Sequence, residues 1–170
     1  MRYWAKDGFL RDPAERFVHH SLGFNFRMPS TSAALARSQL LRLDKLLERK
    51  HQIGRRYNEG LASHPWLQIP QQSTMTSQNS YWVYGTVLHD DAPIDAVLLR
   101  ERLRSRGIDS RRFFFPLNQQ PILRSLGVVS PEPMPVAENL WKRGIYLPSG
   151  LGTTNDEIDR TIDELWSLFS

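Results

Sequence analysis

Apolar residues recur every three, four or seven positions between residues 31 and 63, which predicts one long amphipathic helix. The positions that follow this period are Ala36, Leu40, Leu43, Leu47, Gly54, Tyr57 and Leu61. Ser30, Thr31 and Ser32 can supply the hydroxyl that caps its first turn, and Pro65 stops it. Because the opposite face is charged, the helix needs a second surface on which to bury its leucines.

Beyond this helix, strand-like and helix-like patterns alternate. The polar stretch 71–80 has no period and is predicted to be a surface loop. The order that follows is strand, helix, strand, helix, strand, helix, over residues 81–88, 91–107, 108–117, 136–143, 145–148 and 154–169. Thr154 and Glu157 form a capping box at the start of the last helix, and Gly107 suits the end of the helix predicted over 91–107. This alternation predicts an α/β or α+β layer, with helices on a small sheet.

The first thirty residues differ from the rest because they are rich in aromatic residues but have neither a helical nor a strand period. The large apolar side chains in this stretch are Trp4, Phe9, Phe17, Val18, Leu22, Phe24 and Phe26. We therefore divide the chain into a segment 1–30, expected to lie on another surface, and a domain 31–170.

The composition excludes several classes of protein. The 170 residues include no cysteine, so a disulfide framework, a thiolate metal site and a cysteine nucleophile are all excluded. The histidines have no partner at metal-binding spacing, so we predict no metal site. No apolar run reaches the roughly 18–20 residues of a membrane span, and the first residues do not resemble a signal peptide. A cytoplasmic protein that does not bind membranes is expected.

The charge is uneven along the chain. Residues 1–60 hold twelve Lys or Arg and six Asp or Glu, within a net charge of +4. Such a bias indicates either an anionic partner or a solvated helix face. Nucleic-acid binding is disfavoured, because Asp44, Glu48 and Glu59 interrupt the basic face and no helix-turn-helix signature is present. No glycine-rich phosphate loop occurs either.

Two segments combine cations, amides and aromatic residues. In the first, residues 23–28, Asn25 and Arg27 lie between phenylalanines; Asn25 caps a turn, or both side chains donate hydrogen bonds to an anion. In the second, residues 111–121, two arginines, three phenylalanines and three amides are close in sequence. This segment either stacks on and neutralises a nucleotide ligand, or is an edge strand whose aromatic residues fill the core.

The two segments and the helix between them resemble the C-terminal part of the DegT-type nucleotide-sugar aminotransferases, a pyridoxal-phosphate family with the aspartate aminotransferase fold. The matching motifs occur in order along nearly the whole chain: Gly23-Phe-Asn-Phe-Arg-Met28, Ala33-Ala34, Gln39-Leu-Leu-Arg-Leu-Asp44, Ser80-Tyr-Trp-Val-Tyr84, Gly107-Ile-Asp-Ser-Arg111, Phe115-Pro-Leu117, Gln120-Pro121, Ala137-Glu138 and Gly144-Ile-Tyr-Leu-Pro-Ser149. The run Phe113-Phe-Phe-Pro116 is most similar to the perosamine-synthase branch, which aminates a GDP-linked 4-keto-6-deoxy sugar.

The resemblance implies roles for five residues. Asn25 would reach across a homodimer interface to the cofactor phosphate of the partner subunit, and Arg27 would lie beside it. Phe115 and Asn118 would line the sugar-nucleotide pocket, and Arg111 would contact the diphosphate or the sugar. The family commonly has histidine where Asn118 stands; asparagine keeps the hydrogen bonding but cannot become cationic near neutral pH.

The resemblance also implies which part is missing. In the family, the lysine that forms the Schiff base lies in a larger domain, upstream of the segment that matches residues 23–28. We expect none of the four lysines of this chain, Lys6, Lys45, Lys50 and Lys142, to take that role. A transaminase needs such an amine, so this chain alone is expected to be inactive.

The predicted function is therefore that of a C-terminal fragment of a pyridoxal-phosphate-dependent sugar aminotransferase. The complete homodimer would transfer an amino group from glutamate to a 4-keto-6-deoxy nucleotide sugar of the perosamine type, in polysaccharide or O-antigen biosynthesis. The alternative is a non-catalytic truncated domain that acts only as a binding or dimerisation module.

Overall fold

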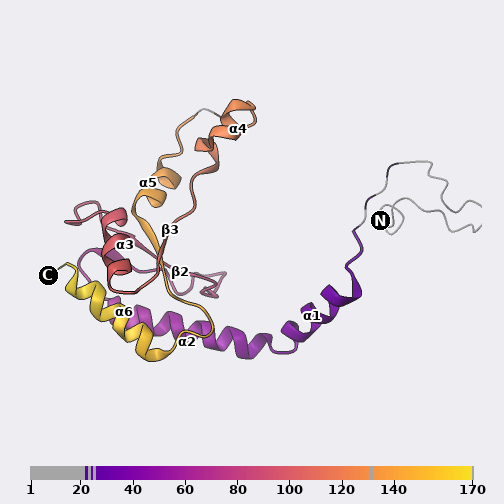
Figure 1. Ribbon diagram of the computed structural model, residues 1–170, viewed down its shortest axis with the longest axis horizontal. Coiled ribbons are helices and arrows are strands. Elements are labelled where there is room, and N and C mark those ends of the chain that lie inside the picture. Colours follow the sequence, from indigo (N-terminus) through magenta and orange to yellow (C-terminus); the bar gives the residue numbers. More distant parts are fainter. Residues whose placement is uncertain (1–21, 23, 25, 131, 170) are drawn as a thin grey trace, which may run out of the picture. The chain divides into compact units, whose positions relative to one another are not determined.

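A computed structural model describes residues 22, 24, 26–130 and 132–169, and the chain divides into two units, residues 1–43 and 44–170 (Figure 1). In the first unit, helix α1 spans Ser30–Leu40, and each of its residues is exposed. The second unit contains the sheet and the hydrophobic core. Among the described residues, no helix is long and apolar enough to cross a membrane.

The prediction of one helix over residues 31–63 is wrong in one respect, because the helix is broken at Leu41 and Arg42. Helix α2 begins at Leu43 and ends at Leu61. The amide of Arg42 donates to the carbonyl of Gln39, three residues back, and this tighter bond interrupts the regular helical ladder. The predicted leucine stripe is likewise buried only from Ile53 onward.

The second unit has a four-stranded sheet in the order β1-β2-β4-β3, with every neighbouring pair antiparallel. The strands are β1 (Leu67–Gln68), β2 (Tyr84–Leu88), β3 (Arg111–Arg112) and β4 (Gly144–Leu147). The remaining helices are α3 (Ala96–Ser105), the 3-10 turn η2 (Leu117–Gln119), α4 (Pro121–Ser125), α5 (Pro135–Arg143) and α6 (Asn155–Ser167). Mixed helices on a small antiparallel sheet confirm the predicted fold class, as an α+β arrangement.

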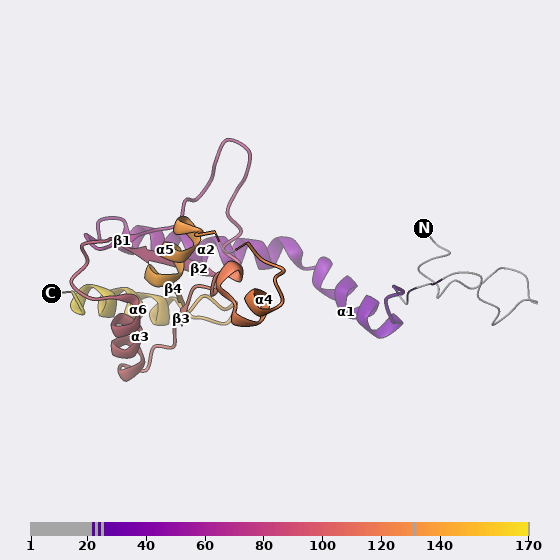
Figure 2. The same cartoon turned by 90° about the horizontal axis from the view of Figure 1, so that it is seen from above.

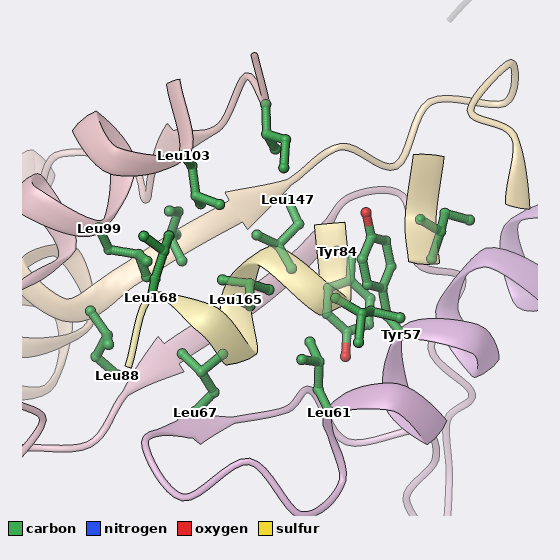
Figure 3. Close-up of a cluster of buried hydrophobic side chains, with 14 of the residues drawn as sticks. Tyr57, Leu61, Leu67, Tyr84, Leu88, Leu99, Leu103, Leu147, Leu165 and Leu168 are labelled. Atoms are coloured by element: carbon green, nitrogen blue, oxygen red, sulfur yellow. The ribbon is translucent and has the colours of Figure 1, made fainter. Parts of the chain in front are cut away.

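Helices α2 and α6 run side by side along one face of this sheet (Figures 1 and 3). Ile162 of α6 packs against Gly60 of α2, where a Cβ atom would meet it at 2.6 Å. Asp159 accepts two hydrogen bonds from Arg56 across the same contact, at 2.6 and 2.5 Å. The side chains buried beneath the two helices are Ile53, Tyr57, Leu61, Leu67, Tyr84, Leu88, Leu99, Leu103, Ile145, Leu147, Ile158 and Leu165.

Two predicted strands are shorter than expected. The strand predicted at 81–88 begins at Tyr84, because Tyr81 has a φ of 49°, which no strand residue adopts. The strand predicted at 108–117 is reduced to Arg111–Arg112, after which Phe113 crosses the sheet over Gly144. The structure also contains β1 and α4, for which the sequence showed no period.

Two local capping signals are confirmed and one is wrong. The N-cap residue of α1 is Pro29, which makes no side-chain capping hydrogen bond, so the hydroxyl cap predicted from Ser30, Thr31 or Ser32 is not formed. The helix predicted over 91–107 is also shorter, because Asp95 caps it and it begins at Ala96.

The hydroxyl of Thr154 accepts from the amide of Glu157, and the Glu157 carboxylate accepts from the amide of Thr154 at 2.7 Å. Gly107 follows the end of α3 with a φ of 75°. The predicted loop 71–80 projects from the unit (Figure 2) as a polar turn closed by a bridge between Ser73 and Gln78.

His64 couples the fold to pH. Its ring is 4% exposed and lies 4.6 Å from the ring of Trp166 and 5.0 Å from that of Phe169. Burial, with a smaller effect of His89, lowers the pKa of His64 below its usual 6.5. The unfolded chain therefore takes up the proton first, and folding stability falls as the pH drops below about 6.5.

We expect the free energy of unfolding in urea to fall between pH 7.5 and pH 5.5, and the fall to be smaller in His64→Gln. Each unit by which the pKa is lowered corresponds to about 1.4 kcal/mol. His51→Gln, which removes a half-buried histidine of α2, is the control for the loss of an imidazole as such. An unchanged slope in His64→Gln would show that other groups cause the pH dependence.

Candidate functional site

An open cleft of about 480 Å³ lies beside the edge strand β3, in the second unit. Its walls come from α2, from the two residues before β2, from the connection before β3 and the first residue of β3, from β4 and the loop after it, and from the first turns of α6. Its lining includes the cations Lys50, Arg111 and Arg160, the aromatic residues Trp82 and Tyr146, and the hydroxyl residue Ser110. Of the four predicted site residues that the structure describes, Arg111 alone lines this cleft.

The sheet register fixes the position of Arg111. Arg111 pairs with Tyr146 across the β3–β4 ladder, so the two side chains share one face of the sheet. Tyr146 stacks on Phe113 with ring centroids 4.5 Å apart. Burial raises the pKa of the Tyr146 phenol, and the positive charge of Arg111 opposes this rise. Arg111 itself is exposed and can therefore meet an anion from solution.

Lys50 projects from α2 into the same cleft and is held there by the backbone. Its Nζ donates to the carbonyl of Ser149, and partial burial lowers the pKa of its ammonium group. The hydroxyl of Ser149 accepts from the amide of Tyr84 at 3.0 Å, which anchors the loop that holds Lys50. In the sequence, Lys50 stands between Leu47 and Gly54, where the helical period calls for an apolar residue, and this misfit is a sequence signal for the position.

The cleft favours anions. Lys50, Arg111 and Arg160 face two carboxylates, Asp109 and Glu157. Glu157 already accepts from the amide and the hydroxyl of Thr154, and these bonds lower its pKa. Trp82, 73% exposed, adds a flat aromatic surface at the rim. Sequence reasoning missed Trp82 and Arg160, since neither lies in a segment that combines amides with cations.

Phe115 and Asn118 lie elsewhere, among the residues that lead to α5. The ring of Phe115 meets Trp141 edge-on at 4.8 Å. Asn118 is 8% exposed, and its amide donates to the carboxylate of Glu138 at 3.3 Å and to the carbonyl of Glu132 at 3.4 Å. The structure does not bring these two residues into the cleft of Arg111, and their predicted contact with substrate stays a prediction.

The segment before α1 belongs to the first unit. Arg27 is exposed. Phe24 and Phe26 stack with ring centroids 5.2 Å apart, although both are exposed, at 53% and 75%. Asn25, the residue predicted to contact the cofactor phosphate, lies outside the described residues. Both roles stay predictions.

The described residues do not by themselves form a site for pyridoxal phosphate. Of the three lysines among them, Lys45 and Lys142 are exposed, and Lys50 donates to a backbone carbonyl. An internal aldimine needs a lysine amine directed at the cofactor. We therefore assign no chemical step on this cofactor to the residues of this chain.

Comparison with known proteins identifies the relatives of the chain. It is 32% identical over 160 residues to "Putative pyridoxal phosphate-dependent aminotransferase EpsN" of Bacillus subtilis, covering 94% of the chain and 40% of that protein. It is 31% identical to the GDP-perosamine synthase of Vibrio cholerae, over 92% of the chain and 41% of that enzyme. The chain thus spans about 40% of the length of these relatives.

The fold is also that of a solved aminotransferase. Helicobacter pylori PseC, described as an aminotransferase involved in the biosynthesis of pseudoaminic acid, aligns over 99% of the chain and 44% of its own, with a TM-score of 0.84 and 20% identity. This likeness confirms the predicted aminotransferase fold, and the partial coverage agrees with a C-terminal part. The pyridoxal-phosphate prediction agrees with the description of EpsN. Because the family model of the DegT/DnrJ/EryC1/StrS aminotransferases matches residues 1–166, the chain belongs to that aminotransferase family.

Proposed function

We propose that this chain is the C-terminal part of a pyridoxal-phosphate-dependent aminotransferase that transfers an amino group from glutamate to a 4-keto-6-deoxy nucleotide sugar. A perosamine-type product, used in polysaccharide or O-antigen synthesis, is the proposed outcome. The single observation that carries the proposal is the family match over residues 1–166. The similarity to a GDP-perosamine synthase supports the choice of substrate.

The residues of this chain would contribute binding rather than the covalent chemistry. Arg111, exposed at the rim of a cationic cleft, is suited to a sugar-nucleotide phosphate. In a homodimer, Asn25 would donate to the cofactor phosphate of the partner subunit, with Arg27 beside it. Phe115 and Asn118 would border the sugar pocket. The cofactor, bound by the complete enzyme, supplies the electron sink for amino transfer, and its lysine would come from the part of the enzyme that this chain does not cover.

A graft tests this proposal. The stretch of the Vibrio cholerae GDP-perosamine synthase that matches this chain is replaced by residues 1–170, and the dimeric graft is assayed with glutamate and a GDP-linked 4-keto-6-deoxy sugar. We expect turnover well above that of the recipient without the stretch. Asn25→Ala in the graft should weaken cofactor retention, measured by absorbance after gel filtration, by about ten- to a hundredfold, since a charge-assisted hydrogen bond contributes about 1.5–3 kcal/mol.

Each negative outcome of the graft has a separate meaning. A folded graft that retains cofactor but aminates no keto sugar contradicts the aminotransferase proposal. A graft that aminates another keto sugar but not this one contradicts only the perosamine-type substrate. Unchanged cofactor retention in Asn25→Ala removes Asn25 from the cofactor site.

The exposed and stacked rings of Phe24 and Phe26 favour one further candidate, a non-catalytic binding module. Isolated apolar residues on a surface are common, but a contiguous apolar segment marks a contact site. Activity of the graft would contradict this alternative. A monomeric or dimeric chain that captures a partner only while both phenylalanines are present would support it.

A further inference from the structure

A second groove, of about 600 Å³, shares with the cleft described above the residues that connect α3 to β3. The residues that line it come from one short stretch of the chain, and three of them are arginines. Two arginines of α3, four residues of the connection and the first residue of β3 form it: Arg100, Arg104, Gly107, Ile108, Asp109, Ser110 and Arg111. Three guanidinium groups therefore face one carboxylate.

These three arginines are unlike most other arginines of the unit. Arg56, Arg106 and Arg143 each form an ion pair, with Asp159, Glu164 and Asp90 respectively. Within the described part of the chain, by contrast, the guanidinium groups of the groove have no ion pair and no hydrogen bond. Arg100 and Arg104 are four residues apart on a helix and so lie on one face. Two positive charges therefore lie close together on this face of the helix.

Ser110 provides an independent sign of a ligand. The residue is only 7% exposed, and its hydroxyl has no hydrogen-bond partner among the described residues. Leaving a buried hydroxyl unpaired costs about 1–3 kcal/mol, so native structures seldom keep one without a reason. Ser110 lines both the groove and the cleft described above. A ligand oxygen in this place would accept the missing hydrogen bond.

We propose that this groove binds a phosphate-bearing anion, with Arg100, Arg104 and Arg111 as cationic donors and the hydroxyl of Ser110 as a neutral one. A phosphate or diphosphate group offers several oxygens and about two negative charges, which match three guanidinium forks better than a single carboxylate does. The proposal does not depend on the aminotransferase activity, since none of the four residues needs the cofactor.

Titration of the 170-residue chain with pyrophosphate, followed by calorimetry at fixed ionic strength, tests the proposal. Arg104→Gln keeps a good helix former at an exposed position, and we expect it to weaken binding about tenfold or more. Ser110→Ala should weaken binding several-fold while the thermal midpoint stays level or rises, because an unpaired hydroxyl is removed. Loss of affinity without loss of stability is a result that a structural role would not give.

Arg102→Gln is the matched control. Arg102 and Arg104 both lie in the last turn of α3, so the two changes remove the same charge from the same helix end. Arg102 does not line the groove, and it donates instead to the carbonyl of Leu168 at 3.4 Å. The control should bind pyrophosphate as the wild type does. Equal weakening by both variants, or equal effects of both on duplex DNA binding, would reveal only a diffuse basic surface and overturn the proposal.

Two further ligands separate the possible sources of the phosphate. Inorganic phosphate and GDP are titrated beside pyrophosphate, with circular dichroism to verify that each variant is folded. Tighter binding of GDP, lost in Arg104→Gln, would assign the groove to a nucleotide. Equal binding of GDP and pyrophosphate would assign it to a diphosphate group alone. Binding of none of the three ligands at millimolar concentration by the folded wild type refutes the site.

Discussion

Replacing Tyr57 by alanine is expected to lower the free energy of unfolding by about 3–5 kcal/mol, the range for removing a buried aromatic ring. Tyr57 is fully buried between α2 and the sheet (Figure 3), with its ring centroid 4.6 Å from that of Tyr84. Its hydroxyl donates to the carbonyl of Pro148 at 2.8 Å, and burial raises its pKa to about 12. A loss of this size is a large part of the stability of an ordinary domain.

Urea denaturation measures the effect, and two variants serve as controls. Tyr57→Phe keeps the ring but leaves the Pro148 carbonyl without its donor, so it should cost only about 1–2 kcal/mol. Trp82→Ala removes a ring that is 73% exposed and should change stability by less than about 0.5 kcal/mol. Equal losses in the alanine and phenylalanine variants of Tyr57 would place the stabilisation in the hydrogen bond instead of the ring.

Gly54→Ala is expected to destabilise the protein by about 1–3 kcal/mol, although the same change stabilises most helices by about 1 kcal/mol. Gly54 lies within α2, and an alanine Cβ would come closer than 3.0 Å to the ring of Tyr81. Tyr81 is itself 2% exposed, and the amide of Asn58 donates to its hydroxyl at 3.0 Å. The ring therefore has no empty space into which it can move.

The reversal of sign makes this prediction simple to check by urea denaturation. Gly152→Ala is the control for space, since a Cβ atom added there would meet no other atom within 4 Å and the φ of this glycine is not positive. A double variant with Tyr81→Ala should show that the cost of Gly54→Ala disappears once the ring is removed. If Gly54→Ala stabilised the protein instead, the ring of Tyr81 would have to move away from α2 at little cost, and the prediction would be wrong.

Local signals in the sequence predicted two helix ends correctly, because capping depends on residues within a few positions of one another. The Thr154–Glu157 box and the left-handed Gly107 are examples. The break at Leu41–Arg42 could not be predicted in this way, since the hydrophobic period continues across it. The period reports which side chains share a face, and it says nothing about a single shortened backbone hydrogen bond.

Long-range pairing limited what the sequence could say about the site. Arg111 was predicted, and its strand pairing with Tyr146 brings it to a cleft. Lys50 and Arg160 line the same cleft from helices that are far apart in the chain, and spacing along the sequence cannot bring such residues together. Asn118 shows the opposite case, a predicted site residue that the structure places outside this cleft. Its amide donates hydrogen bonds to Glu138 and Glu132 instead.

The two outer strands of the sheet, β1 and β3, have only two residues each. An unpaired strand edge can form backbone hydrogen bonds with a strand of another chain, and the number of such bonds grows with the length of the edge. Edges this short, one of them Arg111–Arg112 with two positive charges, offer few free amides and carbonyls to a second sheet. Copies of this domain should therefore resist strand-to-strand aggregation, and any assembly must use side chains on its helices and loops rather than a continuous sheet.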